Sequence, residues 1–108
     1  MPIEGDKKQN VLTPPPTPFN LPLAVAGTAQ DVVLVPVGKK GRSLSLINDG
    51  PGDIALGFDA AATISGTLIQ EGERYWEVDL QLATKVSFIN VTALATPTVR
   101  GVLWSGPA

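Results

Sequence analysis

The densest group of ionisable side chains in this chain is acidic: Glu71, Glu73, Glu77 and Asp79. Two carboxylates that face each other across a cleft catalyse glycoside hydrolysis, and several together bind calcium. If residues 74–82 form a strand, Glu77 and Asp79 share one face of it, with Cβ atoms about 7 Å apart. A solvated strand face explains the same spacing, and this interpretation is preferred to catalysis or calcium binding.

Most other catalytic chemistry is excluded because two residue types are missing. The 108 residues include no histidine and no cysteine. This excludes His-based acid–base catalysis, thiol chemistry, disulfides and zinc sites built from Cys and His. Asp49 and Asp53 flank Gly50-Pro51-Gly52, but a calcium loop needs more carboxylates and a distal glutamate, so both are interpreted as turn residues. We expect no enzymatic activity, no cofactor and no metal.

Three aromatic side chains are candidates for binding a ligand or another protein: Tyr75, Trp76 and Trp104. Successive strand residues point to opposite faces, so Tyr75 and Trp76 lie on different faces of a strand. The alternation in residues 74–82 puts Trp76 on the same face as Leu80 and Leu82. We expect both tryptophans to pack in the core or at a subunit interface, with a sugar-stacking platform as the alternative.

The charge balance argues against nucleic acid as a partner. Eight basic and ten acidic residues give a net charge of −2, whereas a nucleic-acid binder presents a basic face. Charged residues make up 17% of the chain, below the roughly 25% of an average soluble domain. A surface so poor in charge suggests that other protein covers part of it. The basic group Lys39, Lys40 and Arg42 is interpreted as a solvated turn, with an acidic partner surface as the alternative.

Residues 30–108 show the pattern of short antiparallel strands. Arg42–Ile47 alternate polar and apolar residues, and the turn Asn48–Gly52 separates them from Ile54–Phe58, which predicts a hairpin. Further segments at roughly ten-residue spacing predict an all-β antiparallel sandwich of seven or eight short strands, either jelly-roll-like or a small barrel. We expect no secretion signal and no membrane-spanning segment.

One internal similarity links two of the predicted strands. Ser45-Leu46-Ile47-Asn48 resembles Ser87-Phe88-Ile89-Asn90. One interpretation is that the strands of a sandwich are generally alike. The other is that the two segments belong to equivalent hairpins in two facing sheets.

Residues 1–29 are predicted to form a separate extended arm. Five prolines between Pro14 and Pro22 exclude a helix and a central strand, and they favour polyproline II. Apolar residues along this segment indicate docking into a neighbouring chain, with a disordered tail as the alternative. The predicted interface residues are Val11, Leu12, Pro14, Pro15, Pro16, Pro18, Phe19, Leu21 and Leu23.

Three segments of the body carry a resemblance to a known group of proteins. Leu46–Phe58 contains an Asn-x-Gly turn and ends in Gly-Phe, Leu68–Glu73 is an acidic glycine turn, and Thr98–Trp104 is a closing strand. This pattern resembles the small β-sandwich virion proteins of tailed bacteriophages. The resemblance implies a capsid decoration or cement protein on the exterior of the virion. Its partners would be the major capsid protein and copies of itself, in a homotrimer.

Physical arguments from size agree with an assembly component. A body of about 80 residues without disulfides is marginally stable alone, and oligomerisation is the remaining stabiliser. A head-fibre or tail adaptor is one alternative function. The other is a carbohydrate-binding module that uses Trp76 or Trp104. We expect neither a membrane nor a nucleic acid among the partners.

Overall fold

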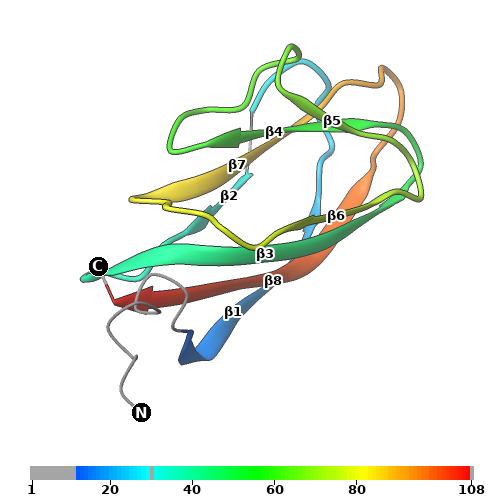
Figure 1. Ribbon diagram of the computed structural model, residues 1–108. Helices are drawn as coiled ribbons and strands as arrows, with labels where there is room; N and C mark the ends of the chain where they lie inside the picture. The colour runs from blue at the N-terminus through cyan, green and yellow to red at the C-terminus, as the bar shows by residue number, and fades with distance from the viewer. Residues whose placement is uncertain (1–11, 30, 108) are drawn as a thin grey trace.

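The computed structural model describes residues 12–29 and 31–107, which fold into eight strands and no helix (Figure 1). None of the described residues belongs to a helix long and apolar enough to cross a membrane. The strands form two four-stranded antiparallel sheets, so the predicted all-β antiparallel sandwich is confirmed. The strands are β1 (Thr13–Pro22), β2 (Asp31–Leu34), β3 (Lys39–Gly50), β4 (Ile54–Phe58), β5 (Thr67–Ile69), β6 (Arg74–Glu77), β7 (Lys85–Asn90) and β8 (Thr98–Pro107).

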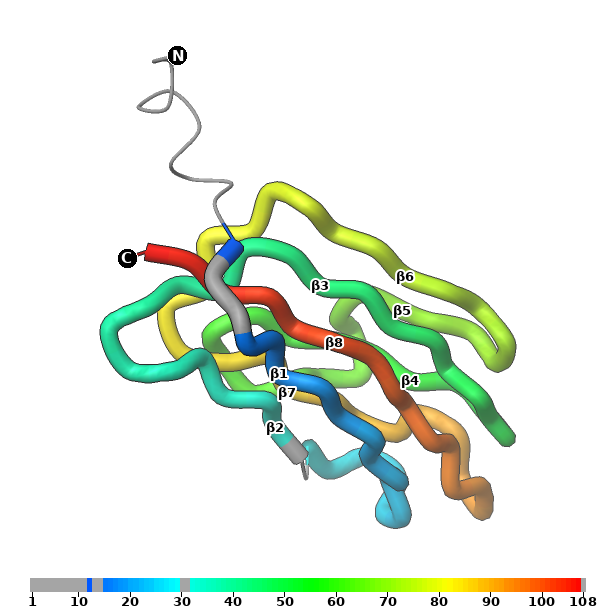
Figure 2. The backbone as a smooth tube through the Cα atoms, turned by 90° about the horizontal axis from the view of Figure 1, so that it is seen from below, coloured from blue at the N-terminus to red at the C-terminus, as the bar shows by residue number. Residues whose placement is uncertain are grey.

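The order of the strands is that of a jelly roll. The first sheet has the order β1-β8-β3-β6, and the second sheet has the order β2-β7-β4-β5. Strands β1 and β8, β2 and β7, β3 and β6, and β4 and β5 are therefore all hydrogen-bonded pairs. The chain follows the path of one long hairpin, with β4 and β5 at its closed end, wrapped into two facing sheets. Figure 2 views the molecule from the side of the first sheet.

The core lies between the two sheets and follows the predicted alternation. In β3, Leu44 and Leu46 are buried, whereas Ser45 between them is exposed. In β8, Val99 and Leu103 are buried on the same side. The other buried apolar side chains of this core are Leu23, Val33, Val35, Ile54, Leu56, Ile69, Leu80, Leu82, Val86 and Phe88.

The proline-rich segment belongs to the sandwich. Strand β1 pairs with β8 from Pro22 opposite Thr98 to Thr17 opposite Leu103, and the register shifts between Thr13 and Thr17. Prolines are tolerated here because β1 is an edge strand, with a partner on one side only. The separate arm predicted for residues 1–29, and its boundary with a body of residues 30–108, is therefore wrong for residues 13–29. Residues 1–11 lie outside the described residues.

Three of the apolar residues predicted to dock into another chain, Phe19, Leu21 and Leu23, instead pack in the core of their own domain. The Phe19 ring lies against Phe88, with ring centroids 5.4 Å apart. Leu23 is fully buried, and its backbone N–H donates to the carbonyl oxygen of Pro97 (2.9 Å). Leu21 packs against the same core. Closing a covalently attached segment onto the core costs less entropy than binding a separate molecule. For this reason these apolar residues of the segment pack on their own domain and not on another chain.

The turn at residues 48–52 is a corner between the sheets. Strand β3 lies in the first sheet and β4 in the second, so the predicted hairpin is wrong. Asn48 is fully buried and organises the corner. Its Oδ1 accepts the Gly50 N–H (2.9 Å), and its Nδ2 donates to the carbonyl oxygens of Gly52 (2.9 Å) and Ile69 (3.1 Å). The turn residues were correctly recognised, but they do not specify whether the chain reverses within a sheet or crosses to the other one.

The internal similarity marks equivalent positions in the two facing sheets. Asn90, fully buried at the end of β7, repeats the hydrogen-bonding pattern of Asn48. Its Oδ1 accepts the Thr92 N–H (2.7 Å), and its Nδ2 donates to the carbonyl oxygens of Leu23 (3.0 Å) and Ala95 (2.7 Å). The second interpretation was therefore right about the facing sheets, although the shared structure is a corner and not a hairpin.

Candidate functional site

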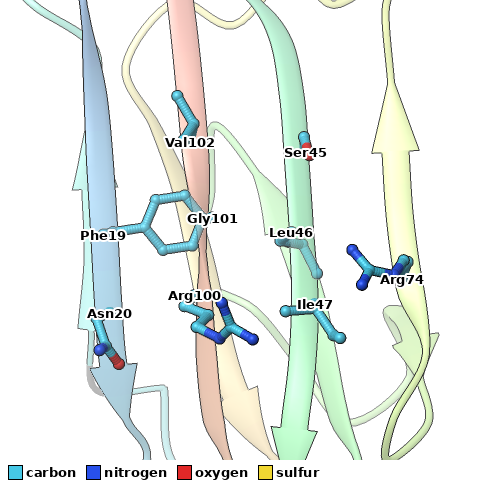
Figure 3. Close-up of a pocket in the computed structure, with 9 residues that line it drawn as sticks. All are labelled: Phe19, Asn20, Ser45, Leu46, Ile47, Arg74, Arg100, Gly101 and Val102. Carbon is cyan, nitrogen blue, oxygen red and sulfur yellow. The ribbon is translucent and has the colours of Figure 1, made fainter.

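The outer face of the first sheet gathers polar, cationic and aromatic side chains from four strands. Phe19 and Leu46 pack in the core, so their neighbours along each strand point outward. We call this surface the arginine face (Figure 3). Its residues are Pro18 and Asn20 of β1, Ser45 and Ile47 of β3, Arg74 and Trp76 of β6, and Arg100 and Val102 of β8.

The strand register arranges these residues in two rows across the sheet. Residues paired across antiparallel strands point to the same face, so each row is contiguous. The first row is polar and cationic at its ends and consists of Asn20, Arg100, Ile47 and Arg74. The second row is mainly apolar and consists of Pro18, Val102, Ser45 and Trp76.

A shallow groove of about 380 Å³ runs over the first row. It extends from Asn20 to Arg74, and Figure 3 shows both guanidinium groups reaching toward Ile47 from either side. Gly101 contributes to the groove because β8 packs closely on β3 there. A Cβ atom on Gly101 would lie 2.1 Å from the Ser45 carbonyl oxygen, so any larger residue would push the strands apart.

The two arginines of the groove differ in their partners. The Arg100 Nε donates to the Asp49 Oδ2 at 2.6 Å, and this hydrogen bond raises the pKa of Arg100. No carboxylate in the described part of the chain forms an ion pair with Arg74. The groove therefore carries an excess of positive charge, with donors of both guanidinium groups left for a ligand.

Trp76 is the most prominent apolar side chain of the face, at 75% exposed. A second hollow of about 220 Å³ lies beside it and shares Ser45 and Arg74 with the groove. Core packing, one of the environments expected for Trp76, is therefore wrong. The chain bends at Val78 and Asp79, which breaks the alternation that placed Trp76 on the side of Leu80 and Leu82. Interface and ligand-binding roles for Trp76 stay predictions.

The other two aromatic candidates point elsewhere or are partly covered. Tyr75 lies on the opposite face of β6 from Trp76, as predicted, and packs against the core. Its hydroxyl donates to the Glu77 Oε1 (3.3 Å), and burial, together with the charge of Glu77, raises the pKa of Tyr75. Trp104 of β8 is half-buried and pairs with Ser43 of β3, two residues along β8 from Val102. The three aromatic side chains therefore do not form one platform.

The structure separates the predicted arm residues. Leu23 is buried, Phe19 and Leu21 are half-buried against the core, and only Phe19 of these lines the groove. Pro16 is half-buried, whereas Leu12 is exposed. The remaining predicted residues are the exposed Pro15 and Pro18, Pro14 within β1, and Val11, which lies outside the described residues.

Arg74 and Arg100 were missed by the sequence analysis. Each lies two residues from another member of the face, Trp76 and Val102 respectively. The spacing of two residues within each strand could therefore have predicted that Arg74 shares a face with Trp76, and Arg100 with Val102. The sequence could not predict that Arg74 and Arg100 lie on the same surface, because β6 and β8 are joined only through β3, which lies far from both in the sequence.

The acidic group contributes acceptors for turns. Glu71 Oε1 accepts the Gly52 N–H (2.8 Å), and Glu73 Oε1 accepts the Gln70 N–H (2.7 Å). Asp53 Oδ1 accepts the Glu71 N–H (2.9 Å), so Asp53 is a turn residue as predicted. Across residues 12–29 and 31–107, no three Asp, Glu, His or Cys side chains gather where they could hold a metal ion.

The prediction that Lys39, Lys40 and Arg42 form a solvated turn is wrong for Arg42. This side chain is 6% exposed and donates to Gln81 Oε1 (2.9 Å) and to the carbonyl oxygen of Pro107. It joins β3 to the end of β8 and is not available to a partner. Lys39 and Lys40 begin β3 and are half-buried.

A scan against protein-family models and searches of curated proteins and of solved structures find no match to this chain.

Proposed function

We propose that this protein is a non-enzymatic virion structural protein of the capsid decoration or cement type, and that it binds the shell through the arginine face. The observation that carries the proposal is the exposed Trp76 beside Arg74, which forms no ion pair with any described residue. Both lie on the outer face of a sheet, in a chain that is poor in charge. Tryptophan and arginine are the residues most enriched among those that dominate binding energy at protein interfaces. Their position on rigid strands suits them to a surface that binds without rearrangement.

A second exposed apolar surface supports a role between subunits. Val32 and Leu34 of the edge strand β2 are 42% and 65% exposed, and Val37 beyond them is fully exposed. A cement protein contacts both the shell and its neighbours on the shell. The arginine face would meet the major capsid protein, and the β2 surface would contact copies of the same chain in a homotrimer.

The fold supports the proposal by analogy only. Eight-stranded jelly rolls are common in viral capsid proteins and in lectins. One fold hosts many functions, so the argument depends on the exposed surface and not on the strand order.

Reconstitution on shells tests this function. Purified phage heads that lack the protein are mixed with the full chain, sedimented and analysed for bound copies. We expect binding that saturates at many copies per head. Trp76→Asp should weaken it about tenfold or more, because the complex loses a tryptophan that contact with the shell would bury. Leu94→Asp, at a fully exposed position between β7 and β8 and outside both proposed surfaces, is the control and should bind normally. Failure of the wild-type chain to bind any heads would contradict the proposal.

Copy number and solution mass separate the remaining alternatives. Binding at only a few positions per particle would indicate a head-fibre or tail adaptor instead of a cement protein. Light scattering of the purified chain is expected to give the mass of a trimer. A monomer at all concentrations would contradict the proposed β2 contact between copies.

A carbohydrate-binding function is the second candidate because Trp76 stands exposed beside the hollow at Ser45 and Arg74. An exposed indole can stack on a sugar ring while the arginine and serine donate hydrogen bonds. A glycan array combined with tryptophan fluorescence tests it. Responses that disappear in Trp76→Ala would favour this function, and a flat response across all glycans would eliminate it.

A further inference from the structure

We infer that the arginine face recognises an extended acidic peptide of its protein partner, with two carboxylate side chains three residues apart. This inference rests on the proposed function, because it names the chemistry of the partner segment. It would equally apply to any protein partner that presents such a segment.

The charge of the groove identifies the ligand as anionic. Arg74 has no ion pair with any described residue, and Arg100 uses only its Nε toward Asp49. The remaining guanidinium donors of both residues point over the groove (Figure 3). Arginine binds carboxylates through two parallel hydrogen bonds, and this geometry is more specific than the point charge of a lysine.

The distance between the backbones of the two arginines matches the distance between residues three apart in an extended peptide laid across the strands. Arg74 and Arg100 belong to one row and flank Ile47, so their backbones are two strand spacings apart. At about 4.8 Å per spacing, this distance is about 9.6 Å. A polyproline II segment advances about 3.1 Å per residue and has three residues per turn, so residues three apart lie on one side at about 9.3 Å.

The second row supplies the apolar contact that such a segment needs. Trp76 and Val102 lie on either side of Ser45, whose small side chain leaves the hollow beside Trp76 open. Proline-rich segments dock against exposed aromatic side chains and lose little entropy because they are already extended. An acidic segment with prolines between its two carboxylates would therefore contact both rows at once.

Two synthetic peptides of the same composition test the spacing. One contains Glu-Pro-Pro-Glu and the other Glu-Glu-Pro-Pro, each capped at both ends and titrated into the full chain while tryptophan fluorescence is followed. We expect the first peptide to bind about tenfold more tightly, because only it can reach both arginines. Equal affinities, or no binding of either peptide, would overturn the inference.

Two substitutions with the same charge change test the site. Arg74→Gln should weaken binding of the Glu-Pro-Pro-Glu peptide about tenfold, whereas Lys85→Gln, on the second sheet, should leave it unchanged. Thermal unfolding of both variants checks that they are folded. Equal effects of the two substitutions would show that only net charge matters, which contradicts a specific site. Binding of an oligogalacturonate that depends on Arg74, without peptide binding, would instead assign the groove to acidic saccharides.

Comparison with the shell experiment keeps the two proposals separate. If heads bind the chain in a Trp76-dependent manner but neither peptide binds, the inference fails and the proposed function stands. If the spaced peptide binds selectively but heads do not bind the chain, the inference stands and the proposed function fails.

Discussion

The outer faces of the two sheets differ in how far the described chain covers them. On the second sheet, the connection between β4 and β5 folds back over the strands. Ala62 of this connection packs with Ala55 and Ile89 in a small second core, and its N–H donates to the buried Ser87 Oγ (2.8 Å). On the first sheet, Arg74 and Trp76 are exposed, and no described segment covers them.

Close approach of the covering connection depends on two glycines. A Cβ atom on Gly57 would lie 2.8 Å from the Ala62 Cα, and one on Gly66 would lie 2.4 Å from the Leu56 carbonyl oxygen. Asp59 anchors the start of the connection by accepting hydrogen bonds from the Thr84 side chain and from three successive backbone N–H groups. The connection between β4 and β5 thus covers part of the second sheet, whereas none of the described segments covers the outer face of the first sheet. This contrast is the reason for assigning binding of the shell to the first sheet, whereas the proposed contact between copies uses the uncovered edge strand β2.

The largest expected difference in the free energy of unfolding is between alanine substitutions of one isoleucine on each face. Ile89→Ala should destabilise the domain by about 3 kcal/mol, because Ile89 is almost fully buried under the connection. Ile47→Ala, on the arginine face, should cost about 1 kcal/mol or less, since Ile47 is only half-buried. Urea unfolding measures both. Equal losses would show that the first face is also covered.

A smaller effect is expected from the serine that holds the connection. Ser87→Ala leaves the buried Ala62 N–H without its acceptor and should cost about 1–2 kcal/mol. Ser45→Ala, its counterpart on the exposed face, should change the free energy of unfolding by less than about 0.5 kcal/mol. If the two variants unfold at the same urea concentration, the hydroxyl of Ser87 does not fasten the connection.

The acid sensitivity of the covered face should depend on Asp59. The N–H groups of Ala83, Thr84 and Lys85 lower the pKa of Asp59 to about 2, from 3.8. The charged form is favoured by folding, so its stabilisation is present above about pH 4 and is lost as the pH falls toward 2. We expect about 1 kcal/mol, because an exposed carboxylate is screened by solvent.

Thermal unfolding of wild type and Asp59→Asn from pH 7 to about pH 2 measures this contribution. The two curves should converge at the acidic end, since the protonated carboxyl and the amide are both neutral. Parallel curves across the whole range would argue against a role for Asp59 in anchoring the connection.

The smallest effect on stability is expected on the arginine face. Asp49→Asn removes the exposed ion pair with Arg100 and should leave the urea midpoint unchanged. It should also strengthen binding of the Glu-Pro-Pro-Glu peptide by about threefold, because Arg100 no longer shares its charge. A weaker affinity in this variant would indicate that Asp49 orients Arg100 for the ligand.

Local patterns in the sequence predicted the strands and much of the core. The alternation around Leu44 and Leu46 correctly placed one face of β3 inside, and the similarity between Asn48 and Asn90 marked two equivalent corners. Both signals arise from interactions within a few residues or from a period of two. Such information is contained in the order of the residues alone.

The tertiary structure decided which strands meet and which face stays open. The proline-rich segment became β1 because β8 offered a free edge, and the turn at residues 48–52 became a corner because β4 pairs with β7. The arginine face exists only because β3 brings Arg74 and Arg100 to either side of Ile47. Pairing partners are selected by contacts between residues distant in sequence, whose combined energy outweighs local preference, and for this reason the site emerged only from the folded chain.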